Sequence, residues 1–190
     1  MSDSCIAEKV FENVDFSKKK PDAGEYDKCT FVHCDFSGAD VSNVKFSECE
    51  FKSCNLSNTR TSKTVFRGVK FKECKLLGMH FDQCHGFLLS MEFENCNGDF
   101  CTFGKLNLRK TKFMGSKFHE ADFSEADLTG SLFDHCDLDR ATFNNTVLEK
   151  VDFRTSYNFS VDPERNRLKK AKFSLAGIPG LLQKYDIEID

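Results

Sequence analysis

The sequence predicts an all-β fold, a parallel β-helix in which the chain winds into stacked coils, followed by a short C-terminal helix. Large apolar residues recur at every fifth position, and smaller residues recur two positions before them. An α-helix repeats its apolar residues every three to four positions and a flat strand every two, so a period of five requires the chain to turn at every fifth residue. Beyond residue 174 the period changes, which predicts a separate C-terminal element.

The column of large residues defines the coil. It keeps one phase over residues 11–81, slips by two residues near 83–87, continues over 93–153, and is rejoined by Phe173. Of the 21 phenylalanines, 18 fall in this column, so we expect them to form the core. The three exceptions are Phe87, Phe100 and Phe159.

The column of small residues contains eight of the ten cysteines, all but Cys5 and Cys84. We expect these thiols to point inward beside the rings. A buried thiol behaves as a compact hydrophobic group, and burial raises its pKa. The cysteines are therefore predicted to be structural rather than nucleophilic.

The pattern small-Asp-large-Ser/Thr-x, seen in Ala121-Asp122-Phe123-Ser124-Glu125 and in the next five residues, resembles the pentapeptide repeat family. The resemblance covers about residues 9–174. It implies a right-handed, quadrilateral β-helix with four pentads, or twenty residues, per coil. We accordingly expect a β-helix over residues 1–174, with loops near 17–25, 82–87 and 156–168, where the period lapses or shifts.

Residues 175–190 are predicted to cap the β-helix and to join two copies of the chain. Pro179 can begin a short helix. The residues spaced i, i+3, i+4 and i+7 on that helix are Ile178, Leu181, Leu182 and Tyr185. After them, Ile187 and Ile189 alternate as in a strand. The segment resembles the C-terminal dimerisation module of the Qnr-type quinolone-resistance proteins and their mycobacterial relative, which implies a homodimer joined end to end; folding back over the open end of the coil is the alternative.

Composition excludes several classes of protein. The net charge is -3 and the sequence pI is about 6.0, which argues against a general nucleic-acid binder. No segment approaches the roughly 20 apolar residues that cross a bilayer, so we expect no membrane contact. The N-terminus carries charges where a signal peptide needs an apolar stretch, which predicts a cytoplasmic protein with reduced thiols.

Acidic residues gather between residues 119 and 153, where nine carboxylates face two basic side chains. The Qnr-type resemblance implies a DNA-mimicking dimer that binds a type II topoisomerase, either DNA gyrase or topoisomerase IV, and these carboxylates are the predicted contacts. The predicted partner-binding residues are Glu120, Asp122, Glu125, Asp127, Asp134, Asp137, Asp139 and Asp152. The alternative is a generic protein-interaction scaffold with an unknown partner, in which Asp before the central residue serves the turns.

No catalytic or cofactor motif is present in the sequence. His80, Cys84 and His85 cluster at the shift in period and could converge on zinc, but the cluster lacks a fourth ligand. We therefore predict a protein that is not an enzyme and that has no cofactor and no metal site.

Overall fold

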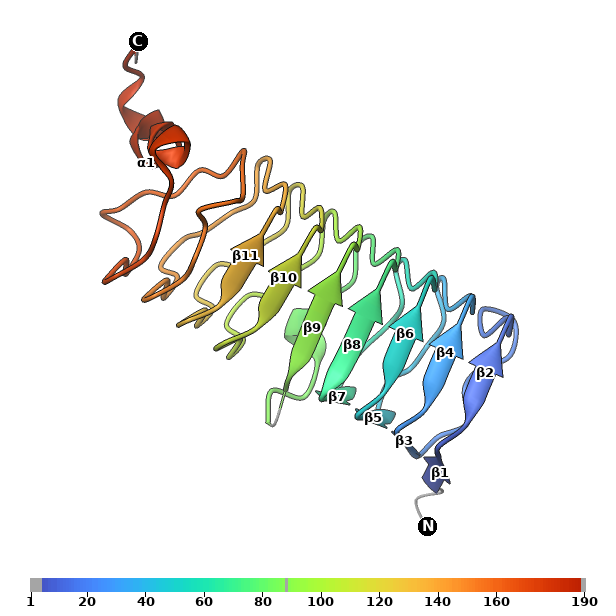
Figure 1. The fold of residues 1–190 in the computed structure, drawn as a ribbon. Coiled ribbons are helices and arrows are strands. Elements are labelled where there is room, and N and C mark those ends of the chain that lie inside the picture. Colours follow the sequence, from blue (N-terminus) through green and yellow to red (C-terminus); the bar gives the residue numbers. More distant parts are fainter. Residues whose placement is uncertain (1–4, 88, 189–190) are drawn as a thin grey trace.

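The structure is a computed structural model that describes residues 5–87 and 89–188, and it is a solenoid of short parallel strands with β1 and α1 at opposite ends (Figure 1). One sheet has four strands in the order β1 (Cys5–Ala7), β3 (Glu25–Asp27), β5 (Lys45–Ser47) and β7 (Val65–Arg67). The other has seven in the order β2 (Val10–Glu12), β4 (Thr30–Val32), β6 (Glu50–Lys52), β8 (Val69–Lys72), β9 (Met91–Glu94), β10 (Lys112–Met114) and β11 (Leu132–Asp134). The predicted parallel β-helix is confirmed.

A regular coil has twenty residues, because Phe31 pairs with Phe51 and Phe51 with Phe71, and the strands and bridges form four sides. We name the sides A to D in chain order. Side A holds the four-stranded sheet and side B the seven-stranded sheet. Side C is the ladder of isolated bridges that begins at residue 15, and side D is the ladder that begins at residue 40.

The corners explain the polar slots of the repeat. The residue two positions after the central one adopts left-handed backbone angles, as at His33 (φ 52°). The residue before the central one often accepts a hydrogen bond from the backbone two positions later: Asp35 Oδ1 accepts from the Ser37 N–H at 2.9 Å. Such Asx turns favour Asp and Asn. The chain can therefore corner every five residues without glycine at each turn.

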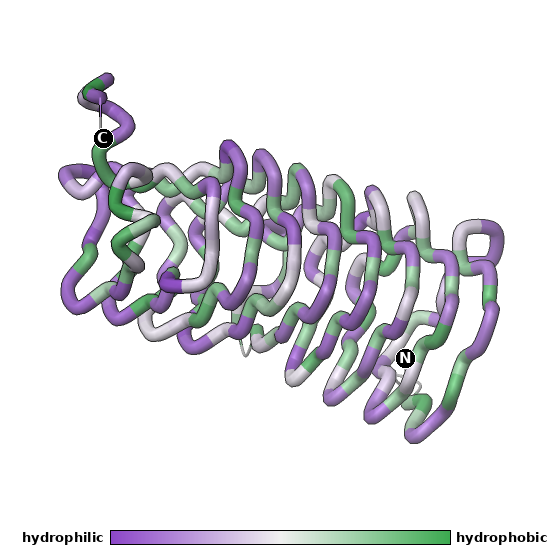
Figure 2. Tube along the Cα trace, turned by 45° about the horizontal axis from the view of Figure 1, so that its top comes forward, coloured by the Kyte–Doolittle hydropathy of each residue, from purple (hydrophilic) through white to green (hydrophobic). Residues whose placement is uncertain are grey.

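Stacked aromatic rings fill the interior. On side B they form one ladder from Phe11 to Phe173, with centroids 4.4 Å apart at Phe113–Phe133 and 5.5 Å apart at Phe153–Phe173. Every phenylalanine of the predicted column from residue 16 to residue 153 is buried, whereas Phe11 and Phe173 in the end coils are partly buried. Hydrophobic and hydrophilic stretches alternate along the coils (Figure 2).

The ten cysteines are free thiols, and nine of them are buried. Cys84 was expected outside the inward column, but that expectation is wrong: the shift in period comes after residue 84, so Cys84 keeps the inward slot of its pentad and is buried. Burial raises the pKa of both Cys49 and Cys84 to about 12. Cys5 is exposed.

The shift in period produces a bulge on side A. Val69 pairs with Met91, a separation of 22 residues in place of twenty. A 3-10 helix, η1 (Phe81–Gln83), precedes the bulge. The four-stranded sheet ends at β7, just before the bulge. The two added residues are therefore accommodated outside the coil, and stacking resumes at β9.

Residues 17–24 and 156–168 contain no strand, yet both segments keep the register of the coil. Cys5 pairs with Glu25, and Val147 forms a bridge with Arg167. Inside the second segment, Phe159 and Val161 are buried. Both segments thus form sides of the first and last coils instead of adding length to them.

The C-terminal segment consists of η2 (Leu175–Gly177), α1 (Pro179–Leu182) and η3 (Gln183–Tyr185), with Pro179 in the first turn of α1. It projects from the end of the solenoid (Figure 1). Ile187 is exposed and not in a strand, and Ile189 lies outside the described residues. Among the described residues, no helix combines the length and the apolar character needed to cross a membrane.

The opposite end of the solenoid has one unusual residue. Lys9 precedes Phe11 by two positions, the slot that Cys29 occupies in the next coil. Lys9 is exposed, whereas Cys29 is buried. The outermost described coil therefore has a cation where the following coils have small, mostly uncharged residues.

Candidate interaction surfaces

The predicted partner-binding carboxylates are spread around the coil. Bridges place Asp122 on side D, Asp127 on side A, Asp152 on side B and Asp137 on side C. Asp134 follows Phe133 on β11, and Asp139 follows Leu138 on side C. Glu120 and Glu125 occupy corners, with φ values of 54° and 60°. The structure thus gathers these residues in neighbouring coils but not on one side.

Four of these carboxylates have a structural task. One oxygen of each accepts the backbone N–H two residues later, over distances of 2.9 Å for Asp122, 3.0 Å for Asp127, 3.3 Å for Asp137 and 3.2 Å for Asp152. This is the role in turns that the alternative hypothesis, a generic scaffold, assigned to these aspartates. One oxygen of each of these carboxylates is therefore already bonded to a turn, and a partner would contact mainly the other oxygen.

Basic side chains neutralise part of the acidic region. Arg109 Nε lies 2.7 Å from Asp127 Oδ2, and Arg154 Nη2 lies 2.7 Å from Asp152 Oδ2. Burial raises the pKa of Asp127, but hydrogen bonds from Thr129 and Arg109 outweigh it, so the pKa lies below its usual value. Hydrogen bonds from Arg154 lower the pKa of Asp152. Arg109 and Arg154 lie outside the acidic segment in sequence, so charge counting along the chain missed them.

His119 adds a further contact within the acidic region. Its Nε2 lies 2.9 Å from Asp137 Oδ2, and Asp137 Oδ1 accepts a hydrogen bond from Asn158 Nδ2 at 2.9 Å. Burial raises the pKa of Asp137, but the interactions with His119 and Asn158 outweigh it and lower the pKa below its usual value. Asp137 is thereby tied both to the preceding coil and to the start of the last one.

The last coil reverses the charge. Residues 147–172 contain seven basic and four acidic side chains, whereas residues 119–146 contain one basic and seven acidic. We call these the basic band and the acidic band. The basic side chains are Lys150, Arg154, Arg165, Arg167, Lys169, Lys170 and Lys172. The acidic band is thus separated from the C-terminal segment by the basic band.

The C-terminal segment is anchored at one place on the last coil. Val161 N–H donates to Gly180 O at 2.9 Å, and Lys184 Nζ lies 2.7 Å from both Asp162 and Glu164. Gly180 approaches the backbone so closely that a Cβ there would lie 2.3 Å from Phe159 O. Glycine is therefore required for this contact.

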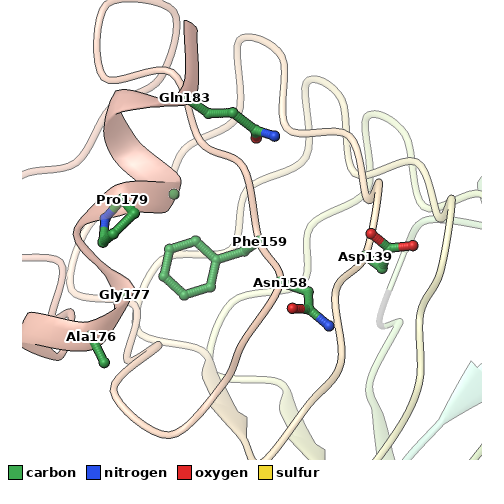
Figure 3. A pocket seen from close by; sticks show the side chains of 8 residues that line it. Asp139, Asn158, Phe159, Ala176, Gly177, Pro179 and Gln183 are labelled. Carbon is green, nitrogen blue, oxygen red and sulfur yellow. The ribbon is translucent and has the colours of Figure 1, made fainter. Parts of the chain in front are cut away.

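A cavity of about 380 Å³ lies between this segment and the coils (Figure 3). The ring of Phe159 lies between the C-terminal segment and the coils, and Asp139, Asn158 and Gln183 line the cavity with polar groups (Figure 3). Asp139 is also held by Arg140 Nε at 3.1 Å. The cavity is polar and open, and it belongs to the anchor of the C-terminal segment.

The rest of the C-terminal segment presents apolar groups to solvent. Leu175 is 92% exposed and Ile187 is 56% exposed. Ile178 and Tyr185 are also exposed, and Leu181 and Leu182 are half-buried. In the last coil, Leu168 and Phe173 are only partly buried. The segment therefore covers one part of the end and leaves apolar surface beside it.

The three residues considered as zinc ligands, His80, Cys84 and His85, have separate contacts. Cys84 is buried, His80 Nδ1 contacts the Thr102 hydroxyl at 3.1 Å, and His85 Nδ1 accepts the Phe87 N–H at 3.3 Å. Within residues 5–87 and 89–188, no three His, Cys, Asp or Glu side chains are placed to hold a metal ion.

Comparison with known proteins identifies the repeat. A family profile described as "Pentapeptide repeat region" matches residues 25–97, and one described as "Pentapeptide repeats (8 copies)" matches residues 121–156, together more than half of the chain. The chain belongs to the pentapeptide repeat family. No curated protein sequence matches this pentapeptide repeat protein.

Two solved structures resemble this pentapeptide repeat protein over most of its length. A trypsin-treated variant of QnrB1, a plasmid-mediated fluoroquinolone resistance protein, matches with a TM-score of 0.60 and 19% identity, covering 98% of this chain and 100% of that one. HetL, a pentapeptide repeat protein involved in heterocyst differentiation regulation in the cyanobacterium Nostoc sp. strain PCC 7120, matches with a TM-score of 0.65 and 13% identity, covering 91% and 87%. At these identities the likeness concerns the fold.

Proposed function

We propose that this pentapeptide repeat protein is a non-catalytic cytoplasmic scaffold that dimerises through its C-terminal segment and binds a type II topoisomerase, DNA gyrase or topoisomerase IV. The observation that carries the proposal is the apolar surface at the end of a solenoid with the fold of QnrB1, a fluoroquinolone resistance protein. Quinolones act on type II topoisomerases, so an enzyme of that class is the first partner to test.

The dimer is supported by what the C-terminal segment leaves uncovered. Leu175, Ile178 and Tyr185 are exposed in the C-terminal segment, and Leu168 and Phe173 are only partly buried in the last coil. A two-fold axis through this end brings each patch against its counterpart and removes both from water. The two basic bands then meet at the centre of the rod, with an acidic band on either side of them.

The topoisomerase contact is assigned to the acidic band, where carboxylates can meet a basic DNA-binding groove. Asp122 forms no ion pair with any described residue, while Glu125 is 3.7 Å from Lys105. Both residues lie at side D and its corner, where Glu125 is exposed and Asp122 is half-buried, so both retain surface that a partner can contact. Contacts of this kind weaken as salt screens them over about 8–10 Å near physiological ionic strength.

A gyrase supercoiling assay, with and without a fluoroquinolone, tests this assignment. Wild-type protein is expected to change the drug response at low ionic strength, and the double variant Asp122→Asn with Glu125→Gln is expected to weaken the effect. Asp35→Asn is the matched control, because Asp35 has the same turn role near the other end of the solenoid. No effect of wild type on gyrase or topoisomerase IV at low salt would refute the topoisomerase assignment.

A second candidate is a scaffold for a different protein partner. It is favoured by the distribution of the carboxylates over four sides and by their bonds to turns and arginines. The two candidates share the dimer, which sedimentation of an Ile178→Asp variant tests separately. A dimer that has no effect on either topoisomerase supports this second candidate.

A further inference from the structure

The bulge on side A exposes an aromatic ring in a chain that buries most of its others. Phe87 is 71% exposed. The backbone holds it there: His85 N–H donates to Thr64 O at 2.9 Å before the bulge, and Ser90 N–H donates to Phe66 O at 2.9 Å after it. Phe87 lies between these two anchors, outside the coil, so its exposure follows from the two added residues.

Beside this ring lies a cavity of about 540 Å³, which we call the Phe87 groove. It runs along side A across three coils, and its lining comes from successive strands and from the bulge. The lining residues are Glu25, Asn43, Lys45, Ser47, Lys63, Val65, Arg67, His85 and Phe87. The exposed lining is mainly apolar, so the groove offers hydrophobic contact to a partner.

The charged lining of the groove is predominantly basic. The groove contains Lys45, Lys63 and Arg67, and its one carboxylate is Glu25. That carboxylate accepts a hydrogen bond from the Ser47 hydroxyl at 2.9 Å and lies 3.9 Å from Arg67. Lys63 forms no ion pair with any residue that the structure describes. The groove therefore combines apolar surface with an excess of positive charge.

We propose that the Phe87 groove binds an extended acidic peptide segment of a partner protein, with an apolar side chain against Phe87 and Val65 and carboxylates near Lys63 and Arg67. Apolar contact gives a small groove most of its affinity, and charge selects the segment. The site uses neither the acidic band nor the C-terminal segment. If the groove does not bind the peptide, the proposed function is unaffected. If the proposed function is refuted, the groove proposal is likewise unaffected.

The test measures peptide binding by the full-length protein. The probes are three fluorescein-labelled hexapeptides: Asp-Leu-Glu-Phe-Asp-Leu, its basic counterpart Lys-Leu-Lys-Phe-Lys-Leu, and the acidic but polar Asp-Ser-Glu-Ser-Asp-Ser. Fluorescence anisotropy is expected to detect binding of the first peptide and at least about tenfold weaker binding of the other two, a difference of about 1.4 kcal/mol. Amide shifts in a ¹⁵N-labelled sample should map the bound peptide to β7 and the bulge.

Matched variants distinguish binding in the groove from nonspecific binding of the peptide elsewhere on the surface. Phe87→Ser and Lys63→Glu are each expected to weaken binding of the acidic-apolar peptide about tenfold. Phe100→Ser is the control for an exposed ring, since Phe100 is 51% exposed outside the groove. Lys110→Glu is the control for charge, because Lys63 and Lys110 occupy the same position of their pentads, with φ values of 57° and 58°, and Lys110 does not line the groove.

Circular dichroism confirms that each variant is folded before its affinity is compared. Retained affinity in both controls, with loss in both groove variants, supports the site. No binding of the acidic-apolar peptide, equal binding of the basic one, or equal losses in the control variants would each overturn the proposal.

Discussion

Replacing Phe123 by alanine tests the core on which the whole solenoid depends. The ring is fully buried and lies between Phe103 at 4.8 Å and Phe143 at 5.2 Å, both nearly parallel to it. Edge-on contacts with Phe113 and Phe133 enclose its sides. Phe103 also stacks on Phe81, and Phe113 stacks on Phe133, so these rings cannot move into the gap without breaking another stack. We therefore expect Phe123→Ala to lower the free energy of unfolding by about 3–5 kcal/mol.

The same substitution should cost less where the ring has fewer neighbours. Phe173 in the last coil is partly buried and has one parallel neighbour, Phe153 at 5.5 Å, so Phe173→Ala should cost about 1–3 kcal/mol. Phe100 is half exposed, and Phe100→Ala should stay within about 0.5 kcal/mol of wild type. Phe123→Ala and Phe100→Ala thus remove the same side chain, in one case from the core and in the other from the surface.

Urea unfolding followed by far-ultraviolet circular dichroism measures these differences. Stacked repeats can unfold in parts, so equal slopes of the transition in all variants are needed before free energies are compared. If Phe123→Ala cost less than about 1 kcal/mol, or no more than Phe100→Ala, the buried ring ladder would be the wrong account of the fold.

Three further predictions follow from individual contacts. In native protein without reductant, a thiol reagent should modify Cys5 quickly and the nine buried thiols slowly, while denatured protein should show ten free thiols; fewer would indicate a disulfide. Hydrogen bonds from Ser42 lower the pKa of Asp40 to about 2, so the stability that this carboxylate contributes is present above the unfolded pKa of about 3.9 and is lost as the pH falls toward 2. In urea titrations, Asp40→Asn should therefore reduce the fall in the free energy of unfolding over this pH range. An unchanged pH dependence would contradict this prediction. A Cβ at residue 98 would lie 2.5 Å from the Phe118 ring, so Gly98→Ala should cost about 1–3 kcal/mol in thermal unfolding, whereas Gly86→Ala, with no atom near its Cβ, should cost less than half as much.

The core could be predicted from the sequence because one physical constraint repeats at every pentad. A large residue every fifth position is compatible only with a chain that turns at the same interval, so the burial of Phe31 or Phe123 follows from its place in the period. The number of sides came from the family resemblance, because a period of five does not fix how many pentads close a coil. The structure supplies that number through the twenty-residue register.

The charges of the surface were harder to predict, because the two residues of an ion pair often lie on neighbouring coils, about one coil apart in the sequence. Arg109 and Asp127 are 18 residues apart, so a charge count along the chain assigned them to different regions. The phase of the period was also misjudged where it changes: Cys84 still belongs to the earlier phase and is buried. Phe159 lies off the column, yet the last coil turns it inward against the C-terminal segment.

Lys9 at the first described coil has a consequence for assembly. Another solenoid stacking there would have to place its last coil over an ammonium group, and removing that charge from water is costly when no counterion is present. Growth of a continuous fibre from this edge is thus disfavoured, even though the neighbouring rings would match. The association proposed for the C-terminal end would therefore stop at two copies instead of continuing into a fibre.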